Sequence, residues 1–256
     1  MQKQYSSDLT DSQWEVISKY IHYQRKSKYA YRRIVEGISY ICKNGCVWRD
    51  LPTCFPPWQT VYYYFGKWNR DETIDLIMNQ LHQKERMKAE RKPLPTALVV
   101  DSQSVKNTAT AIEAIGVDGG KLIKGRKRLY ITDTLGNLMY VKVAPANEHD
   151  SKIAKVAFEN ALLESEMFSN ISLIYADSAF GGTFKEWANE KQMEVEVPKT
   201  YSIKSKEGNF YISPRRWVVE RTIAWSNNAR RLAKDYERKP SVSEAFIKWQ
   251  AIRLAL

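Results

Sequence analysis

Three acidic residues lie at positions where a carboxylate could do chemistry: Asp101, Asp177 and Glu220. Asp101 directly follows the apolar run 97–100, and Asp177 directly follows the apolar run 171–176. Short apolar runs of this kind are typical of buried strands, and ligands collect outside the carboxyl ends of strands in open α/β sheets. If the two strands are neighbours, the two carboxylates lie close together and repel each other unless a cation lies between them.

Glu220 belongs to a predicted helix over 214–239, which has no Gly or Pro after its first turn. The apolar residues of this helix recur three, four and seven positions apart, as on one helix face: Trp217, Val218, Ala224 and Trp225. Glu220 is predicted to lie on or beside that inward face, where a carboxylate needs a cation, either a metal ion or a guanidinium. The alternative is a surface helix in which Glu220 makes an internal ion pair.

Together the three acids form an all-oxygen set of hard ligands, which selects Mg²⁺ or Mn²⁺ over zinc. Two such ions roughly 4 Å apart can activate a water or a 3′-hydroxyl and stabilise the leaving oxygen in phosphodiester chemistry. Three other acids have adequate structural roles and are weaker candidates. Asp118 lies in a glycine loop, Asp133 lies near a hairpin, and Asp150 is expected to be a helix N-cap. The residues therefore predict a site for two divalent metal ions.

Basic residues surround these acids and predict contacts with a polyanion. The helix of Glu220 contributes Arg215, Arg216, Arg221, Arg230 and Arg231. The segment 121–128 contributes five cations and no acid: Lys121, Lys124, Arg126, Lys127 and Arg128. We predict that both groups contact DNA phosphates near the acids. The alternative for the segment 121–128 is a solvated, flexible run of charge.

The composition is that of a globular chain with a nucleic-acid partner. The 256 residues are 43% hydrophobic and 27% charged, and the net charge of +11 predicts an anionic partner. No apolar run approaches the ~18 residues needed to span a bilayer, and the N-terminus lacks an apolar signal core. We therefore expect a cytoplasmic protein without a membrane partner. Cys42, Cys46 and Cys54 are predicted to be buried free thiols, in preference to a disulfide or a zinc site.

Residues 1–92 are predicted to form a helical domain, and Pro93 and Pro95 mark its boundary. Helices are expected after the N-cap Thr10 and over 29–43. Short helices with a basic surplus suggest a DNA reader of the helix-turn-helix type, in which Arg32 and Arg33 are exposed at the start of the second helix. The alternative is a helical cap that only packs on the next domain.

Residues 93–256 change from helical periodicity to alternating strands and helices. Strands are predicted at 97–100, 129–133, 138–143, 171–176 and 194–197. Helices are predicted from Asp150 to about 166, over 183–191 and over 214–239. Three leading strands followed by strand–helix alternation predict an α/β fold, a mixed sheet with helices on both faces.

Six stretches of the chain, taken in order, resemble the DDE transposases of the insertion-sequence-five family. They are GCVWRDLP at 45–52, VVDSQSVK at 99–106, GGK through KGRKR at 119–128, PANEHD at 145–150, ADSAF at 176–180 and RRWVVERT at 215–222. The resemblance covers nearly the whole chain. It implies a ribonuclease H-like core after a helical leader domain, with Asp101, Asp177 and Glu220 as the metal-binding triad.

The resemblance implies a prokaryotic, nucleoid-associated transposase that nicks double-stranded DNA at terminal inverted repeats and joins the freed ends to target DNA. The nuclease chemistry also follows from the acids themselves, whereas strand transfer and action as a homodimer on DNA rest on the resemblance. One departure affects the DNA contacts: Ser213 and Asn227 stand where related transposases carry Tyr and Lys, while Arg216 matches their Arg. The alternative function is a non-catalytic DNA-binding protein on a nuclease-like core.

Overall fold

The computed structural model describes residues 5–21, 27–197 and 216–256. The helices are α1 (Asp11–Ser18), α2 (Tyr31–Asn44), η1 (Trp48–Asp50), α3 (Trp58–Arg70), α4 (Thr73–Lys88), α5 (Asp150–Glu164), η2 (Glu166–Phe168), η3 (Ser178–Phe180), α6 (Thr183–Glu190), α7 (Trp217–Asn227), η4 (Arg230–Leu232) and α8 (Pro240–Ala255). The strands are β1 (Ala97–Lys106), β2 (Gly116–Asp118), β3 (Ile123–Asp133), β4 (Leu138–Pro145), β5 (Leu173–Tyr175) and β6 (Glu194–Glu196). Within these described ranges, no helix has the length and apolar character that crossing a bilayer requires.

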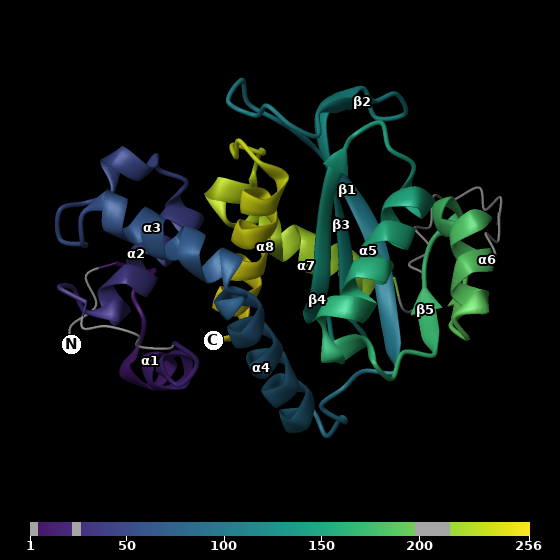
Figure 1. The fold of residues 1–256 in the computed structure, drawn as a ribbon, viewed down its shortest axis with the longest axis horizontal. Coiled ribbons are helices and arrows are strands. Elements are labelled where there is room, and N and C mark those ends of the chain that lie inside the picture. The colour runs from purple at the N-terminus through teal and green to yellow at the C-terminus, as the bar shows by residue number, and fades with distance from the viewer. Residues whose placement is uncertain (1–4, 22–26, 198–215) are drawn as a thin grey trace, which may run out of the picture.

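The six strands form one mixed sheet. The strand order is β2-β3-β1-β5-β6. β4 lies on the same side of β3 as β2: β2 pairs with residues 123–125 of β3, and β4 pairs with residues 126–132. β1 runs antiparallel to β3 and parallel to β5. Helices α5 and α6 pack on one face and α7 and α8 on the other, so the predicted mixed sheet with helices on both faces is confirmed (Figure 1).

Alternation along β1 divides the buried residues between two cores. Leu98 and Val100 lie in the core that includes α5 and α6, whereas Val99 lies in the core that includes α7 and α8. Because side chains two positions apart on a strand share a face, Asp101 is on the same face as Val99. The pleat of the strand thus directs Asp101 toward the side of the sheet that α7 covers, and α7 contacts both β1 and β3.

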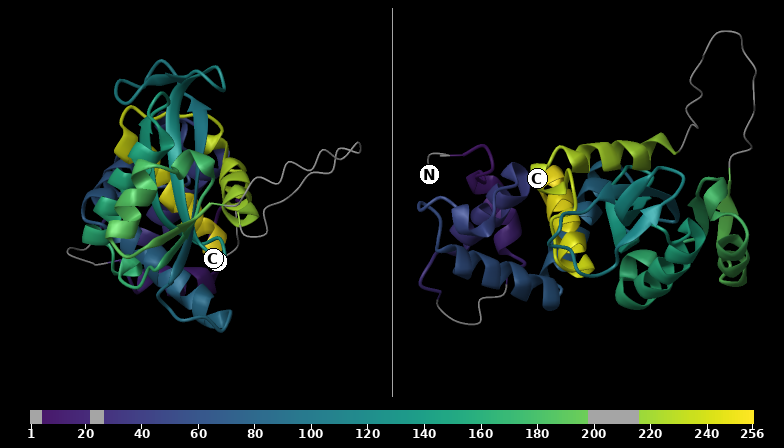
Figure 2. Two further views of the ribbon diagram at one scale, coloured as in Figure 1. Left: turned by 90° about the vertical axis from the view of Figure 1, so that its right-hand side faces the viewer. Right: turned by 90° about the horizontal axis from the view of Figure 1, so that it is seen from above.

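Helix α8 joins the N-terminal helices to the sheet. It lies between the N-terminal helices and the sheet in Figure 1 and in the right-hand view of Figure 2, and it contacts α2, α3, α4 and β4. The ring centroids of Phe65 and Phe246 are 4.5 Å apart, and the stacked rings of Trp68 and Trp249 are 6.4 Å apart. The domain boundary between residues 92 and 93 stays a prediction, because α8, near the C-terminus, completes the core of the N-terminal helices.

Local signals placed the leading helices correctly. Thr10 caps α1 with a full capping box, and Gly45 ends α2 in the left-handed region at φ 72°. All three cysteines are free, but only Cys42 is buried, so the expectation of burial is wrong for Cys54, which is exposed.

Several predicted boundaries are wrong, and β2 and α8 were not predicted. The predicted helix 214–239 ends at Asn227, and its expected first residues lie outside the described ranges. β1 continues to Lys106 and β3 already begins at Ile123, because the two strands pair over nine consecutive positions. The N-cap of α5 is His149, whose side chain accepts a hydrogen bond from the Ser151 amide, and Asp150 is the first helical residue.

Candidate active site

The parallel register of β1 and β5 brings Asp101 and Asp177 together. Val99 is paired with Tyr175, and each aspartate follows its member of this pair by two residues. The expectation that Asp101 ends its strand is wrong, since β1 continues for five residues beyond it against β3. β5, however, stops at Tyr175, so among the described residues no strand pairs with β1 on that side beyond Val99, and Asp177 follows the end of β5 there.

The guanidinium of Arg216 lies among all three predicted acids. Its Nη2 atom is 3.8 Å from Asp101 Oδ2, 3.8 Å from Asp177 Oδ2 and 3.5 Å from Glu220 Oε1. Three carboxylates from β1, the end of β5 and α7 therefore converge on one cation. Such convergence would be unfavourable without positive charge between them.

Backbone amides hold the other oxygen of each aspartate. Asp101 Oδ1 accepts a hydrogen bond of 2.8 Å from the Ser102 amide, and Asp177 Oδ1 accepts one of 2.8 Å from the Ala179 amide. Each Oδ2 atom remains directed toward Arg216. The local backbone thus orients both carboxylates before any ligand arrives.

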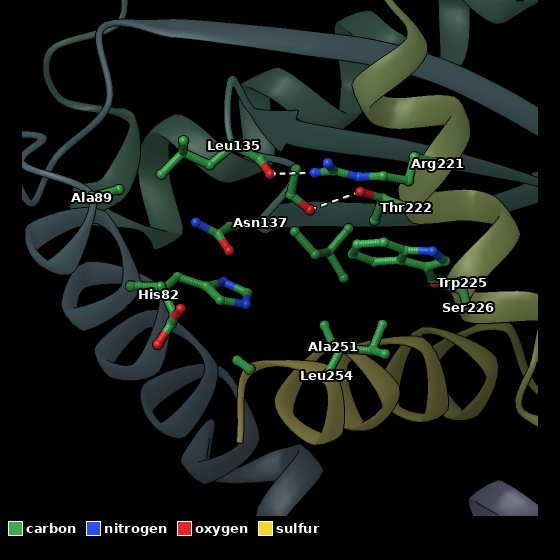
Figure 3. A pocket seen from close by; sticks show the side chains of 14 residues that line it. His82, Ala89, Leu135, Asn137, Arg221, Thr222, Trp225, Ser226, Ala251 and Leu254 are labelled. Atoms are coloured by element: carbon green, nitrogen blue, oxygen red, sulfur yellow. Dashed lines mark hydrogen bonds between the residues drawn. The ribbon is translucent and has the colours of Figure 1, made fainter.

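Glu220 lies on the solvent side of α7, and the prediction of an inward acid is wrong. Its side chain is 53% exposed, whereas α7 buries Val218, Val219, Thr222 and Ser226. The predicted apolar face is also wrong, because Trp217, Ala224 and Trp225 are exposed. The buried face also carries a polar contact to the β3–β4 turn, because Thr222 Oγ1 donates to the carbonyl of Gly136 at 2.7 Å (Figure 3). An ion pair between residues four apart, the alternative reading of this helix, is present between Glu220 and Arg216.

The oxygens that approach Arg216 are of the kind that hard divalent cations prefer. Within the described residues, no three His, Cys, Asp or Glu side chains are grouped closely enough to hold a metal ion. The two aspartates and Glu220 nevertheless already share a cation, and their donor set is all carboxylate. The donor chemistry of Asp101, Asp177 and Glu220 therefore suits Mg²⁺ or Mn²⁺, and these are the residues that could hold such an ion.

The pKa of Asp101 is raised to about 6, chiefly by burial and in smaller part by the charges of Asp177 and Glu220, while the Ser102 amide and Arg216 act to lower it. A carboxyl whose pKa is raised in the folded state stabilises the fold fully below its ordinary pKa. That contribution is lost as the pH rises through about 6. Asp101 is only 17% exposed, so solvent screens this effect little.

Asp101→Asn should therefore stabilise the metal-free protein at pH 8 by about 1–3 kcal/mol, with little or no gain near pH 4. The reason is that asparagine stays neutral where the native carboxylate must ionise. Urea unfolding in EDTA at both pH values measures the difference. An equal gain at the two pH values would assign it to packing and contradict the ionisation argument.

Most of the basic segment 121–128 is not an exposed loop. Neither the predicted contact with DNA phosphates nor the alternative, a solvated run of charge, therefore describes most of this segment. From Ile123 it is part of β3, and Arg126, Lys127 and Arg128 are buried. Arg126 Nη1 donates to Asp235 Oδ1 at 2.8 Å, and Lys127 Nζ lies 3.0 Å from Asp150 Oδ1. These acidic partners are distant in the sequence, and the ion pairs with them hold Arg126 and Lys127 inside the protein. Lys121 and Lys124 are exposed.

The arginines in and after α7 also differ in how exposed they are. Arg231 is buried against Glu237, with 2.6 Å between Nε and Oε1, so it is not available to phosphates in this conformation. Arg230 is exposed. The Arg221 Cζ atom lies 4.7 Å from the ring centroid of Trp217 and 4.6 Å from that of Trp225. Arg215 lies outside the described residues.

Arg32 and Arg33 are committed to partners within the protein. Both guanidiniums bind Glu36, and their side chains are only 15% and 18% exposed. Arg32 also binds Asp11, and Arg33 lies 4.5 Å from the ring centroid of Phe55. The expectation that they are exposed at the start of a recognition helix is wrong, because a buried acid one turn further along α2 draws them inward.

Two exposed features were missed at the level of sequence. One is the Trp217–Arg221–Trp225 stack, whose spacing of four residues could have indicated a single solvent-facing stripe on α7. The other is the outer face of α3, where Tyr62 is 49% and Tyr63 is 55% exposed. In the sequence, the consecutive residues Tyr62, Tyr63 and Tyr64 resemble core residues. Only the packing of α3 shows which of them are exposed.

Comparison with known families finds two matches along the chain. Residues 9–78 match the model of a transposase of IS4/5 family, and residues 92–254 match the model of the transposase DDE domain. No curated protein matches the sequence. A DDE domain implies a ribonuclease H-like fold, in keeping with the mixed sheet and its flanking helices. The second match spans well over half of the chain, and the chain belongs to the DDE transposases of the IS4/5 family.

Proposed function

We propose that this transposase nicks double-stranded DNA at terminal inverted repeats of its insertion sequence and joins the freed 3′-ends to target DNA. Asp101, Asp177 and Glu220 carry the chemistry by holding two Mg²⁺ or Mn²⁺ ions. The observation that supports this most directly is that all three carboxylates approach one guanidinium atom within 3.8 Å. Bound metal would supply activation of the attacking oxygen and stabilisation of the leaving one.

Arg216 contributes the positive charge of this site from the protein itself. Its contacts of 3.5–3.8 Å with the carboxylates are longer than the about 2.7–2.9 Å of a charge-assisted hydrogen bond, so the guanidinium can still form shorter bonds to a phosphate. We infer that Arg216 pairs with a DNA phosphate next to the cleaved bond. Exposed Lys121, Lys124 and Arg230 extend the phosphate contacts, and the protein acts as a homodimer on DNA.

The outer face of α3 is the best-placed reader of base sequence in the helical region. Val61, Phe65 and Trp68 are buried, which leaves Gln59, Tyr62, Tyr63 and Arg70 exposed on the opposite face. The helix contains no acid. Gln and Arg side chains make bidentate contacts with adenine and guanine in the major groove, and a single exposed helix fits that groove.

Nicking of DNA that carries the repeat sequence, in Mg²⁺ and in EDTA, tests the proposed function. Cleavage in Mg²⁺ that EDTA abolishes is expected. Tight binding without cleavage in Mg²⁺ would instead indicate the non-catalytic DNA-binding protein.

Gln59→Ala should weaken binding to repeat DNA by about 1–3 kcal/mol and leave binding to scrambled DNA unchanged. The matched control is Lys124→Ala, which should weaken both equally and flatten the dependence of log K on log salt by about 0.9. Fluorescence anisotropy of the full-length protein over a salt series measures both. The full chain is needed because α8 completes the core of the helical region. Equal losses on both DNAs for Gln59→Ala would remove α3 from base recognition.

A further inference from the structure

The turn between β2 and β3 presents an apolar side chain to solvent. Leu122 is 83% exposed, and its neighbours Lys121 and Lys124 are exposed as well. Val117 of β2 is 54% exposed and pairs with Lys124 across the hairpin. β2 lies at the upper end of the sheet in Figure 1. The tip of this hairpin is therefore an apolar residue with a cation on each side.

The backbone of the turn is strained at the leucine. Leu122 has a φ of 53°, in the left-handed region that bulky side chains rarely adopt, whereas a glycine would adopt it without cost. Asp118 closes the turn, because its Oδ1 atom accepts hydrogen bonds of 3.1 Å from the Gly120 and Lys121 amides. Backbone strain of this kind is concentrated at functional sites. Strain and exposure together indicate that the leucine at this tip has a binding role.

The tip and the acids lie on the same face of the sheet. Asp101 is paired with Tyr130, and Lys124 precedes Tyr130 on β3 by six residues. Side chains an even number of residues apart on a strand share a face, so Lys124 is on the face of Asp101. Leu122 is eight residues before Tyr130, which corresponds to about 26 Å at roughly 3.3 Å per residue.

The segment 230–239 covers this face between the acids and the tip. Arg128 donates to the carbonyl of Lys234, and Arg126 donates to the carbonyl of Arg238, so the segment crosses β3. Its two acids, Asp235 and Glu237, are buried. Its exposed charges are all cations, which we call the basic track: Arg230, Lys234, Arg238 and Lys239. Glu113, whose carbonyl accepts from Arg126, is an exposed acid beside the track, and the four cations outnumber it.

We propose that the β2–β3 turn inserts Leu122 between two base pairs of a DNA duplex that lies along the basic track, and so kinks the duplex. Apolar wedges, leucine among them, unstack base steps in this way, and cations beside the wedge contact the flanking phosphates. The inference rests on the proposed function, since the duplex is the one held at the acids. At a rise of about 3.4 Å per base pair, the kink lies about eight base pairs from the phosphate beside Arg216.

The charges around the tip favour DNA over a second copy of the chain as the occupant. In a two-fold contact between copies, the same patch of both subunits meets. Lys121 and Lys124 of one copy would then face those of the other, and such juxtaposition of like charges is unfavourable. Phosphates on both sides of a base step satisfy these cations while the leucine enters the stack.

Energy transfer between fluorophores at the two ends of a short duplex tests the proposal. One arm uses a duplex with the repeat sequence, and the other uses a duplex of unrelated sequence, both with the full-length protein in EDTA. The wild type should bend at least one duplex by about 20–90°. Bending of the repeat duplex only assigns the kink to the element's end, and bending of the unrelated duplex assigns it to target DNA.

Leu122→Ser should bind the duplex without bending it, whereas Leu122→Met, which keeps an apolar wedge, should bend it as the wild type does. A mismatch moved along the duplex locates the kink, because a mismatched step costs less to unstack. A mismatch about eight base pairs from the cleaved phosphate should tighten wild-type binding about tenfold relative to mismatches elsewhere. Leu122→Ser should lose this dependence on position.

Leu163→Ser is the matched control. Leu163 is 87% exposed at the end of α5, which packs on the other face of the sheet. This variant should bend the duplex as the wild type does. Because both leucines are exposed, both serine variants should unfold in urea at the wild-type midpoint, and a difference in bending is then a property of the DNA complex.

The proposal is overturned if the wild type binds both duplexes without bending either, or if Leu122→Ser bends DNA as well as Leu163→Ser. Loss of self-association in Leu122→Ser with unchanged bending would also overturn it, and would make the tip a contact between two copies. Nicking in Mg²⁺ is measured separately. Nicking without bending would contradict this inference alone, and bending without nicking would contradict the proposed function alone.

Discussion

Asp101→Asn, Asp177→Asn and Glu220→Gln should each reduce metal-dependent nicking by more than about a hundredfold. Loss of a residue that merely orients a metal ligand already costs about 10–100-fold, and these side chains are proposed to be the ligands themselves. Duplex binding should change little, because phosphate contacts dominate affinity. Initial nicking rates in Mg²⁺, with anisotropy on the same duplex, measure the two effects.

Asp118→Asn is a suitable control for that series. Asp118 lies in β2 and accepts hydrogen bonds from Ser104 and from the Gly120 and Lys121 amides, away from Arg216. Its replacement should leave nicking within a few-fold of the wild type. A triad variant that cleaves at the wild-type rate would remove that residue from the site.

The largest effect on stability is expected at Asp235. This fully buried carboxylate receives hydrogen bonds from Arg126 and Ser243 and lies 3.6 Å from Arg128 Nη2. Asp235→Ala would leave two buried guanidiniums without their carboxylate, at a cost of about 3–5 kcal/mol. Urea unfolding at neutral pH measures the loss.

Two further variants test whether the cations of β3 stabilise the fold or contact DNA. Lys124→Ala, on the exposed start of the same strand, should change stability by no more than about 0.5 kcal/mol. Arg126→Met should cost less than Asp235→Ala, because it removes one buried charge and fills the space. If Asp235→Ala unfolded like the wild type, while Arg126→Met flattened the salt dependence of DNA binding, Arg126 would be a phosphate contact after all.

Local patterns were sufficient for much of the architecture. A capping box at Thr10, a glycine at the end of α2 and apolar runs before Asp101 and Asp177 each act within a few residues. Such short-range signals predicted the leading helices and the strands of a mixed sheet. Strand ends were missed because pairing between β1 and β3 extends both strands, and pairing depends on a distant segment.

The acids were found in the sequence, but their arrangement was not. Asp101 and Asp177 become neighbours because Val99 pairs with Tyr175 in a parallel register, which no local pattern records. Glu220 was assigned to the inward face of α7, since two tryptophans suggested an apolar stripe. In the structure α7 instead buries Val218, Val219 and Thr222, whose hydroxyl bonds to Gly136, and both indoles are partly exposed and lie against Arg221.

Charge was the property that the sequence predicted least well. By itself the sequence determined an overall excess of positive charge, the presence of three candidate acids and the order of most strands and helices, although β2 and α8 were not predicted. Which cations meet solvent was decided only by the tertiary structure. Arg126 and Arg128 are buried because Asp235, more than a hundred residues away along the chain, is buried beside them. A guanidinium is stable in a protein interior only with such a partner, and folding alone brings the partner to it.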